Sequence, residues 1–364
     1  MSVIKASNIQ NGSSASVNIA LNTDGSATFA QMPVPPSPYA MRNKIINGAM
    51  VIDQRNAGAA VTTGGAFPVD RFQIGFSTDG AYSAQRSTNA PSGFSNSMLF
   101  TTTTADASLS ASQYAAILQN IEGFNTADFA WGTASAKAVT FSFWVQSSLT
   151  GTFGGSVRNG SFNRSYPFTY SISVANTWEY KTVTIPGDIT GTWATDNGTG
   201  VTVFFGLGAG SSVSGTAGVW ASANYLSATG TVSVIGTLNA TFYVTGVQLE
   251  VGSVATPFER RLYNQELAMC QRYYEVDDIP ASGSPKISSS GLAQGTTHYL
   301  AMFKVSKRAT PTVAMTYISN IDNSTSSVGT TSISSGAFRG FNTISNGSFY
   351  YADAWVRYAA SAEL

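Results

Sequence analysis

The sequence is poor in the residues that most catalytic and metal sites require. It has one cysteine, Cys270, and one histidine, His298, among 364 residues. A single cysteine forms no disulfide within a chain, and this pair is too small for a zinc site built from cysteines and histidines. A Ser-His-Asp or Cys-His site would have to use His298, whose neighbours are typical of the start of a strand. We therefore expect no metal, no cofactor and no enzyme.

The sequence is also poor in charged residues. Charged residues make up 10% of the chain, and 19 basic residues balance 19 acidic ones. In ordinary globular domains about a quarter of the residues are charged. Without a net positive charge the chain has little long-range attraction for nucleic acids or anionic membranes, so we expect neither as a partner. Low repulsion between copies favours a homo-oligomer.

Long apolar segments are missing too. No apolar run approaches the roughly 20 residues that span a bilayer, and the start at Met1 lacks the apolar core of a signal peptide. We therefore expect a product made in the cytoplasm.

Two further kinds of catalytic site find little support. The glycines at 154–155 and 206–208 lie between strand-like runs, whereas a nucleotide-binding loop stands between a strand and a helix. Glycoside cleavage needs only two carboxylates, so the composition does not exclude a glycosidase site made of two acidic residues. Their spacing singles out no pair among Glu122, Asp188, Asp196 and Glu250.

The chain is rich in alternating polar and apolar residues separated by glycine and asparagine. Strict alternation over residues 139–145 places two valines and two phenylalanines on one face, and residues 170–174 and 180–185 follow the same pattern. Residues 201–205 are more continuously apolar, like a central strand. This spacing predicts a β-sandwich.

The first 38 residues form a separate segment. Alternation over residues 15–21, a turn at Asp24-Gly25 and a second run at 27–29 predict a hairpin. Because a lone hairpin is marginally stable in water, it should pack on a partner or on other copies. Four prolines between residues 33 and 38 then make a stiff extended linker.

A helix is expected after Pro257, which is acceptable at a helix start. Its apolar residues recur at roughly helical spacing, with charged residues between them. They are Leu262, Leu267, Cys270 and Tyr274. We expect a connecting helix over residues 258–275, with Cys270 on its apolar side, and a smaller second β domain over residues 276–364.

Several motifs mark the two ends of the predicted sandwich. Near its start stand Asn43-Lys44-Ile45-Ile46-Asn47-Gly48, Asp53-Gln54-Arg55 and Asp70-Arg71-Phe72. Near its end stand Gly246-Val247-Gln248-Leu249-Glu250, Ala255-Thr256-Pro257-Phe258-Glu259-Arg260 and Cys270-Gln271-Arg272-Tyr273-Tyr274. These motifs resemble a jelly-roll module common in bacteriophage tail fibres and related virion proteins. The stretches 187–197, 303–313 and 361–364 are also similar to such fibres, the last two to a tip domain. The resemblance covers about residues 42–364.

The resemblance implies an all-β protein. Its parts would be a virion-attachment or oligomerisation segment (1–38), a galactose-binding-like, carbohydrate-binding jelly roll (39–257), the helix and a tip sandwich (276–364). It implies a trimeric tail fibre on the virion surface. Residues 1–38 would bind tail or capsid proteins, and the fibre would take part in recognition of host surface polysaccharide. A head fibre or decoration protein without a ligand is the alternative. A polysaccharide depolymerase is a third, although the repeats of a β-helix are missing.

A glycan site requires aromatic faces beside polar groups. Candidates in loop-like stretches rich in glycine and serine are Trp131, Trp193, Trp220 and Tyr225. The alternative for Trp193 and Trp220 is that they close the core of the sandwich. Asp70 and Arg71 are expected to form a structural pair. No catalytic residue or metal ligand is predicted.

Overall fold

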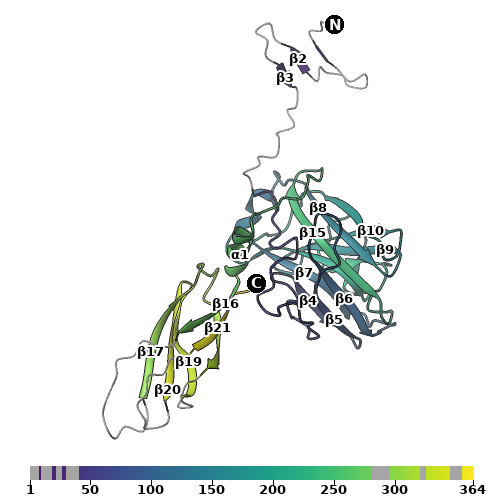
Figure 1. The fold of residues 1–364 in the computed structure, drawn as a ribbon. Coiled ribbons are helices and arrows are strands. Elements are labelled where there is room, and N and C mark those ends of the chain that lie inside the picture. The colour runs from purple at the N-terminus through teal and green to yellow at the C-terminus, as the bar shows by residue number, and fades with distance from the viewer. Residues whose placement is uncertain are drawn as a thin grey trace, which may run out of the picture. The chain divides into compact units, whose positions relative to one another are not determined.

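The computed structural model describes residues 8–9, 19–21, 27–29, 41–280, 295–319, 325–344 and 355–364. The chain forms two compact units, Met1–Arg42 and Asn43–Leu364. In the first, β1 (Asn8–Ile9), β2 (Ile19–Leu21) and β3 (Ala27–Phe29) form an antiparallel sheet (Figure 1). The β2–β3 pairing confirms the predicted hairpin. Its turn and the proline-rich linker lie outside the described residues.

The second unit begins with two antiparallel sheets of five strands each. The first sheet has the order β10 (Ser165–Ile172), β9 (Gly151–Asn159), β12 (Thr199–Ala209), β7 (Tyr114–Glu122), β4 (Gln73–Ser77). The second sheet has the order β11 (Glu179–Ile185), β8 (Val139–Ser147), β15 (Thr241–Val251), β6 (Ser97–Thr104), β5 (Ala81–Ser87). The chain crosses repeatedly between the sheets, as in a jelly roll. The predicted jelly-roll sandwich is confirmed.

Short elements connect these strands. They are the 3₁₀ turns η1 (Gly123–Asn125) and η2 (Ala127–Phe129) and the parallel pair β13 (Ser214–Gly215) and β14 (Ser227–Ala228).

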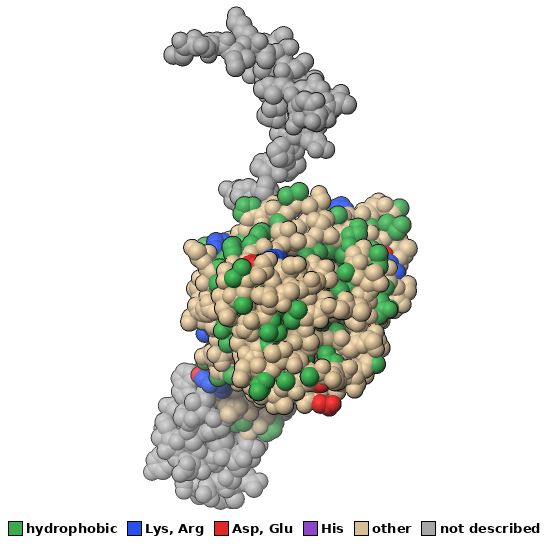
Figure 2. Space-filling view, turned by 90° about the vertical axis from the view of Figure 1, so that its right-hand side faces the viewer, with side chains coloured by type: hydrophobic (Ala, Val, Ile, Leu, Met, Phe, Trp, Pro, Cys, Tyr) green, Lys and Arg blue, Asp and Glu red, His purple; other side chains and the backbone are tan. Residues whose placement is uncertain are grey.

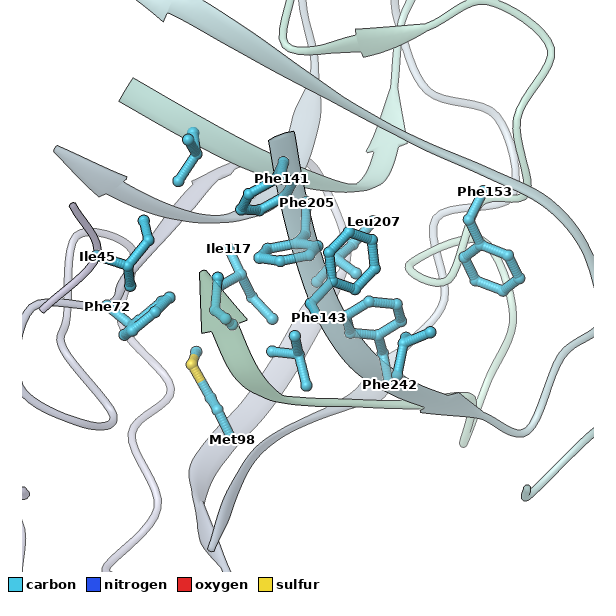
Figure 3. Packing of buried hydrophobic residues seen from close by; sticks show 14 of the residues in the cluster. Ile45, Phe72, Met98, Ile117, Phe141, Phe143, Phe153, Phe205, Leu207 and Phe242 are labelled. Atoms are coloured by element: carbon cyan, nitrogen blue, oxygen red, sulfur yellow. The ribbon is translucent and has the colours of Figure 1, made fainter. Parts of the chain in front are cut away.

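The core lies between the two sheets (Figure 3). In β8 the alternating residues Phe141 and Phe143 are fully buried, as the sequence pattern predicts. They meet Phe205 of β12, whose ring lies edge-on to Phe143 at a centroid distance of 4.9 Å. Burying each such side chain stabilises the fold by roughly 1.5–3 kcal/mol, so the aromatic centre of the sandwich is a main source of its stability.

The segment 43–48, at the start of the jelly roll, is fixed by buried hydrogen bonds. Asn47 has a left-handed backbone (φ 60°) and is fully buried. Its side-chain amide donates to the carbonyls of Ile52 (2.8 Å) and Asp70 (2.9 Å) and accepts from the Ile52 amide (2.9 Å). At Gly48, a Cβ would lie 2.2 Å from the Val247 carbonyl oxygen, so only glycine fits. These contacts give the motif a structural role.

Asp70 and Arg71 do not form the expected pair. Asp70 binds Arg55 at 3.2 Å, and Arg71 binds Glu363. The two residues lie in a turn, in which Arg71 has a left-handed backbone (φ 71°), and each binds a partner from another part of the chain. Burial raises the pKa of Asp70 despite the nearby positive charge of Arg55.

The helix α1 (Tyr263–Gln271) is shorter than predicted at both ends. Before it, Glu259 is held to the sandwich: its amide donates to Gln248 (2.8 Å), and its carboxylate accepts from the Asn43 amide. Leu262 precedes the helix and is 80% exposed, so the prediction that it lies on the apolar side of the helix was wrong. Tyr274 starts the next strand. Cys270 is fully buried, as predicted.

The rest of the unit is a second, smaller β-sandwich, as predicted. One sheet has the order β16 (Tyr274–Pro280), β21 (Trp355–Ser361), β18 (Thr312–Ser319). The other has the order β17 (Gly295–Met302), β20 (Ala337–Ile344), β19 (Thr325–Ile333). His298 lies in β17, opposite Phe341 of β20, which confirms its predicted place in a strand. No helix in the described parts of the chain is long and apolar enough to span a bilayer.

Candidate functional site

A groove of about 350 Å³ crosses the outer face of the first sheet. The floor of the groove is formed by outward-facing side chains of the sheet. In β7 these are the residues that alternate with the core residue Ile117, because successive side chains of a strand point to opposite faces. One row across β7, β12 and β9 consists of Asn120, Thr202 and Arg158. The neighbouring row across β4, β7 and β12 consists of Gln73, Leu118 and Phe204. Two residues along a strand separate the rows by about 7 Å.

Aromatic rings flank this floor. Phe162, in the turn between β9 and β10, is 55% exposed and has a left-handed backbone. The Arg158 guanidinium carbon lies 4.0 Å from the centroid of the Phe162 ring and 4.8 Å from that of Phe204. Tyr114 lines the groove as well. An exposed ring beside a stacked guanidinium offers a flat apolar surface to a ligand.

Amide side chains supply the polar part of the groove. Gln73 donates to the Gly65 carbonyl at 3.0 Å. Asn120 donates to the Leu364 carbonyl at 3.0 Å and accepts from the Thr202 hydroxyl at 2.7 Å. These bonds fix both amides beside the rings, as a site for a hydroxylated ligand requires.

Arg158 is the one charged residue among the described residues that line the groove. Burial lowers its pKa to about 10, so it is positively charged at neutral pH. The described lining contains no aspartate or glutamate side chain, so the pair of acidic side chains that a glycosidase uses is not formed there.

The acidic residues considered from the sequence each have other partners. Glu122 binds Arg272 and the Tyr273 hydroxyl, and Glu250 accepts from Thr256. Asp188 binds Arg164, and Asp196 accepts from the Gly198 amide. Within the described residues no group of three or more histidine, cysteine or acidic side chains could hold a metal ion. These contacts give the four carboxylates structural roles.

The three predicted tryptophans lie together. The Trp131 ring is 4.7 Å from that of Trp193 and 5.2 Å from that of Trp220, edge to face. Each indole N–H has an internal acceptor: Trp131 donates to Lys137, Trp220 to Pro186, and Trp193 to Asp188 and Thr190. Trp131 is 7% exposed, while Trp193 and Trp220 are half-buried against the core. This packing favours the alternative in which they close the sandwich.

Asp188 anchors the tryptophan cluster electrostatically. Burial by itself would raise the pKa of Asp188, but hydrogen bonds from Arg164 and Thr190 outweigh it and hold the pKa below its usual value. The Arg164 nitrogens lie 2.6 and 2.8 Å from the two carboxylate oxygens. Such a two-pronged pair fixes the loop that carries Trp193.

Tyr225 lies apart from the cluster. Its ring covers Gly215, where a Cβ would come within 2.2 Å of it. No ring contact joins Tyr225 to the three tryptophans in the described structure. Whether any of the four touches a ligand stays a prediction.

One face of the molecule is polar but weakly charged. Figure 2 shows one face, on which hydrophobic side chains are scattered among uncharged polar groups, with few lysine, arginine or acidic side chains. Hydrogen bonding and aromatic contact are therefore the main means of recognition available on it.

Arg158, Phe162 and the groove were not predicted from the sequence. The two-residue repeat of a strand places Tyr114, Leu118 and Asn120 on the face of β7 opposite to the core residue Ile117. It does not tell which outward face remains open, because the segment carrying Leu226 comes from far along the chain.

No family model matches the chain, and no curated protein matches it. A structure of the enzymatically active domain of tailspike protein 4 from bacteriophage CBA120 is similar at 13% identity with a TM-score of 0.30, over 59% of this chain and 22% of that one. A family 11 carbohydrate-binding module from Clostridium thermocellum, in complex with a β-1,3-1,4-mixed-linked tetrasaccharide, has 13% identity and a TM-score of 0.28, over 55% and 100% of the chains. A putative sugar binding protein from Bacteroides thetaiotaomicron has 11% identity and a TM-score of 0.32, over 58% and 100%.

The chain thus spans about a fifth of the tailspike structure that it matches. At these identities and TM-scores the similarities carry no argument about ligand or activity. The strand pairing of the chain itself defines the class of protein: an all-β jelly roll followed by a smaller sandwich.

Proposed function

We propose that this chain is a non-enzymatic, glycan-binding protein of a phage virion, with the groove of the first sheet as its binding site. The groove is the observation that carries the proposal. It sets the exposed ring of Phe162 beside the fixed amides of Gln73 and Asn120. A sugar ring needs this combination, because its C–H face packs on an aromatic ring while its hydroxyls exchange hydrogen bonds with amides.

Replacing Phe162 with alanine is expected to weaken polysaccharide binding about tenfold, because the sugar loses its apolar platform. Binding is measured by affinity electrophoresis against a panel of bacterial capsular and O-antigen polysaccharides. Phe124→Ala is the matched control: its ring is 62% exposed and does not line the groove. We expect that control to bind like the unmodified protein.

Different outcomes lead to different conclusions. Unchanged binding by Phe162→Ala together with a loss in Trp220→Ala would move the site to the tryptophan cluster. Failure of the folded, unmodified protein to bind any polysaccharide would favour the alternative, a head fibre or decoration protein without a ligand. Release of reducing sugar would favour a depolymerase.

The virion setting rests on the sequence motifs that resemble fibre modules. We propose a trimeric tail fibre whose residues 1–38 attach to tail or capsid proteins. Light scattering of the full chain is expected to give about three times the chain mass of 38.1 kDa. Residues 1–38 fused to a soluble carrier should bind purified tails or capsids. A stable monomer would contradict the fibre model without affecting the groove.

A further inference from the structure

Arg158 stands out among the enclosed arginines of the second unit. Its Nε is buried and has no hydrogen-bond partner in the described structure. The Nε atoms of Arg71 and Arg261 are also unpartnered, but those guanidinium groups pair with glutamates. Arg158 has no ion pair within the described residues, and its terminal nitrogen donates to the neutral amide of Asn224.

A partly buried cation without a counter-ion is costly, because burial removes water that only an anion or several acceptors replace. The rings of Phe162 and Phe204, on which the guanidinium stacks, offset part of this cost. The face of an aromatic ring does not accept hydrogen bonds from a guanidinium group as a carboxylate does. The remaining attraction of Arg158 is therefore for an anion that enters the groove.

We propose that the groove selects acidic glycans, in which a sugar carboxylate binds the terminal nitrogens of Arg158. This inference rests on the proposed function and names the class of sugar that the same site takes. Arg158 occupies one row of the groove floor with Asn120, and Phe162 adjoins it. A uronic or nonulosonic acid would place its carboxylate on Arg158, its hydroxyls on Asn120 and its ring on Phe162. A planar guanidinium suits a planar carboxylate, and no acidic side chain in the described lining competes for it.

The test compares each acidic polysaccharide of the panel with its carboxyl-reduced form, which keeps the sugar and loses the charge. The unmodified protein is expected to bind acidic forms at least about tenfold more tightly, with binding that weakens as salt is raised. Arg158→Gln keeps a hydrogen-bonding side chain beside Asn224 and is expected to remove this preference. Arg158→Lys keeps the charge without the planar fork and should retain part of it.

Arg260→Gln is the matched control. The Arg260 guanidinium also stacks on two rings, at 4.7 Å from Phe94 and 5.7 Å from Phe258, and it donates to a backbone carbonyl outside the groove. We expect that variant to keep the acidic preference. Circular dichroism and thermal melting show that each variant is folded before binding is scored.

Failure of this inference is distinct from failure of the proposed function. Equal binding of acidic and carboxyl-reduced forms, or an acidic preference that survives in folded Arg158→Gln, overturns the role of Arg158 and leaves the groove as a neutral-glycan site. Absence of binding to every polysaccharide overturns both.

Discussion

Replacing Asn47 with alanine is expected to lower the free energy of unfolding by about 4 kcal/mol, from roughly 1 kcal/mol for each of three buried hydrogen bonds and about 1 kcal/mol for the left-handed backbone. Asn47 is fully buried at φ 60° and bonds Ile52 twice and Asp70 once. Alanine leaves those backbone groups without partners. The loss is measured by urea unfolding followed by tryptophan fluorescence.

Asn239→Ala separates the two contributions. Asn239 also has φ 60°, but it is exposed, so its substitution tests the backbone conformation alone. We expect a loss of about 1 kcal/mol there. Equal losses in the two variants would show that the side-chain bonds of Asn47 contribute nothing.

Replacing Glu275 with alanine is expected to cost about 3–5 kcal/mol, because it leaves a buried ammonium without its counter-ion. Glu275 and Lys307 have fully buried side chains, 2.6 Å apart. The carboxylate also accepts from the Tyr358 hydroxyl and from the Lys304 amide. Burial lowers the pKa of Lys307 even with Glu275 present, although the glutamate opposes that shift. Thermal and urea unfolding measure the change.

Asp278→Ala is the control on the same strand. Asp278 pairs with Arg357 at 2.7 Å, but both side chains are well exposed, at 40% and 56%. Exposed pairs contribute little, since water solvates the freed charges. We expect almost no change in stability. Adding Lys307→Met to Glu275→Ala should recover part of the loss by removing the stranded charge. If Glu275→Ala were as stable as Asp278→Ala, the buried pair would not hold the small sandwich together.

Local patterns predicted the elements better than their ends. Alternation over residues 139–145 identified β8 and its buried face because a strand repeats every two residues. The helix was predicted to be longer than it is, because Leu262 and Tyr274 fit helical spacing in the sequence. Contacts of Glu259 with Gln248 and Asn43 hold the preceding segment to the sandwich, and Tyr274 enters β16.

The candidate site was less predictable than the fold. Trp131, Trp193 and Trp220 were chosen singly for their loop-like surroundings, and the structure brings them into one packed cluster. Arg158 and Phe162 attracted no notice, since an arginine four residues before a phenylalanine has no distinctive meaning in sequence. What distinguishes Arg158 is its partial burial without an ion-pair partner among the described residues, and that depends on strands distant along the chain.

The sequence by itself determined the all-β class, the two sandwiches, the hairpin near the start and the scarcity of residues for metal or histidine chemistry. These follow from composition and short-range periodicity, which act within a few residues. Only the tertiary structure decided that Arg71 binds Glu363, that the tryptophans pack together, and that one sheet face stays open as a groove. Those features depend on segments up to hundreds of residues apart, which become neighbours only when the two sheets close over the core.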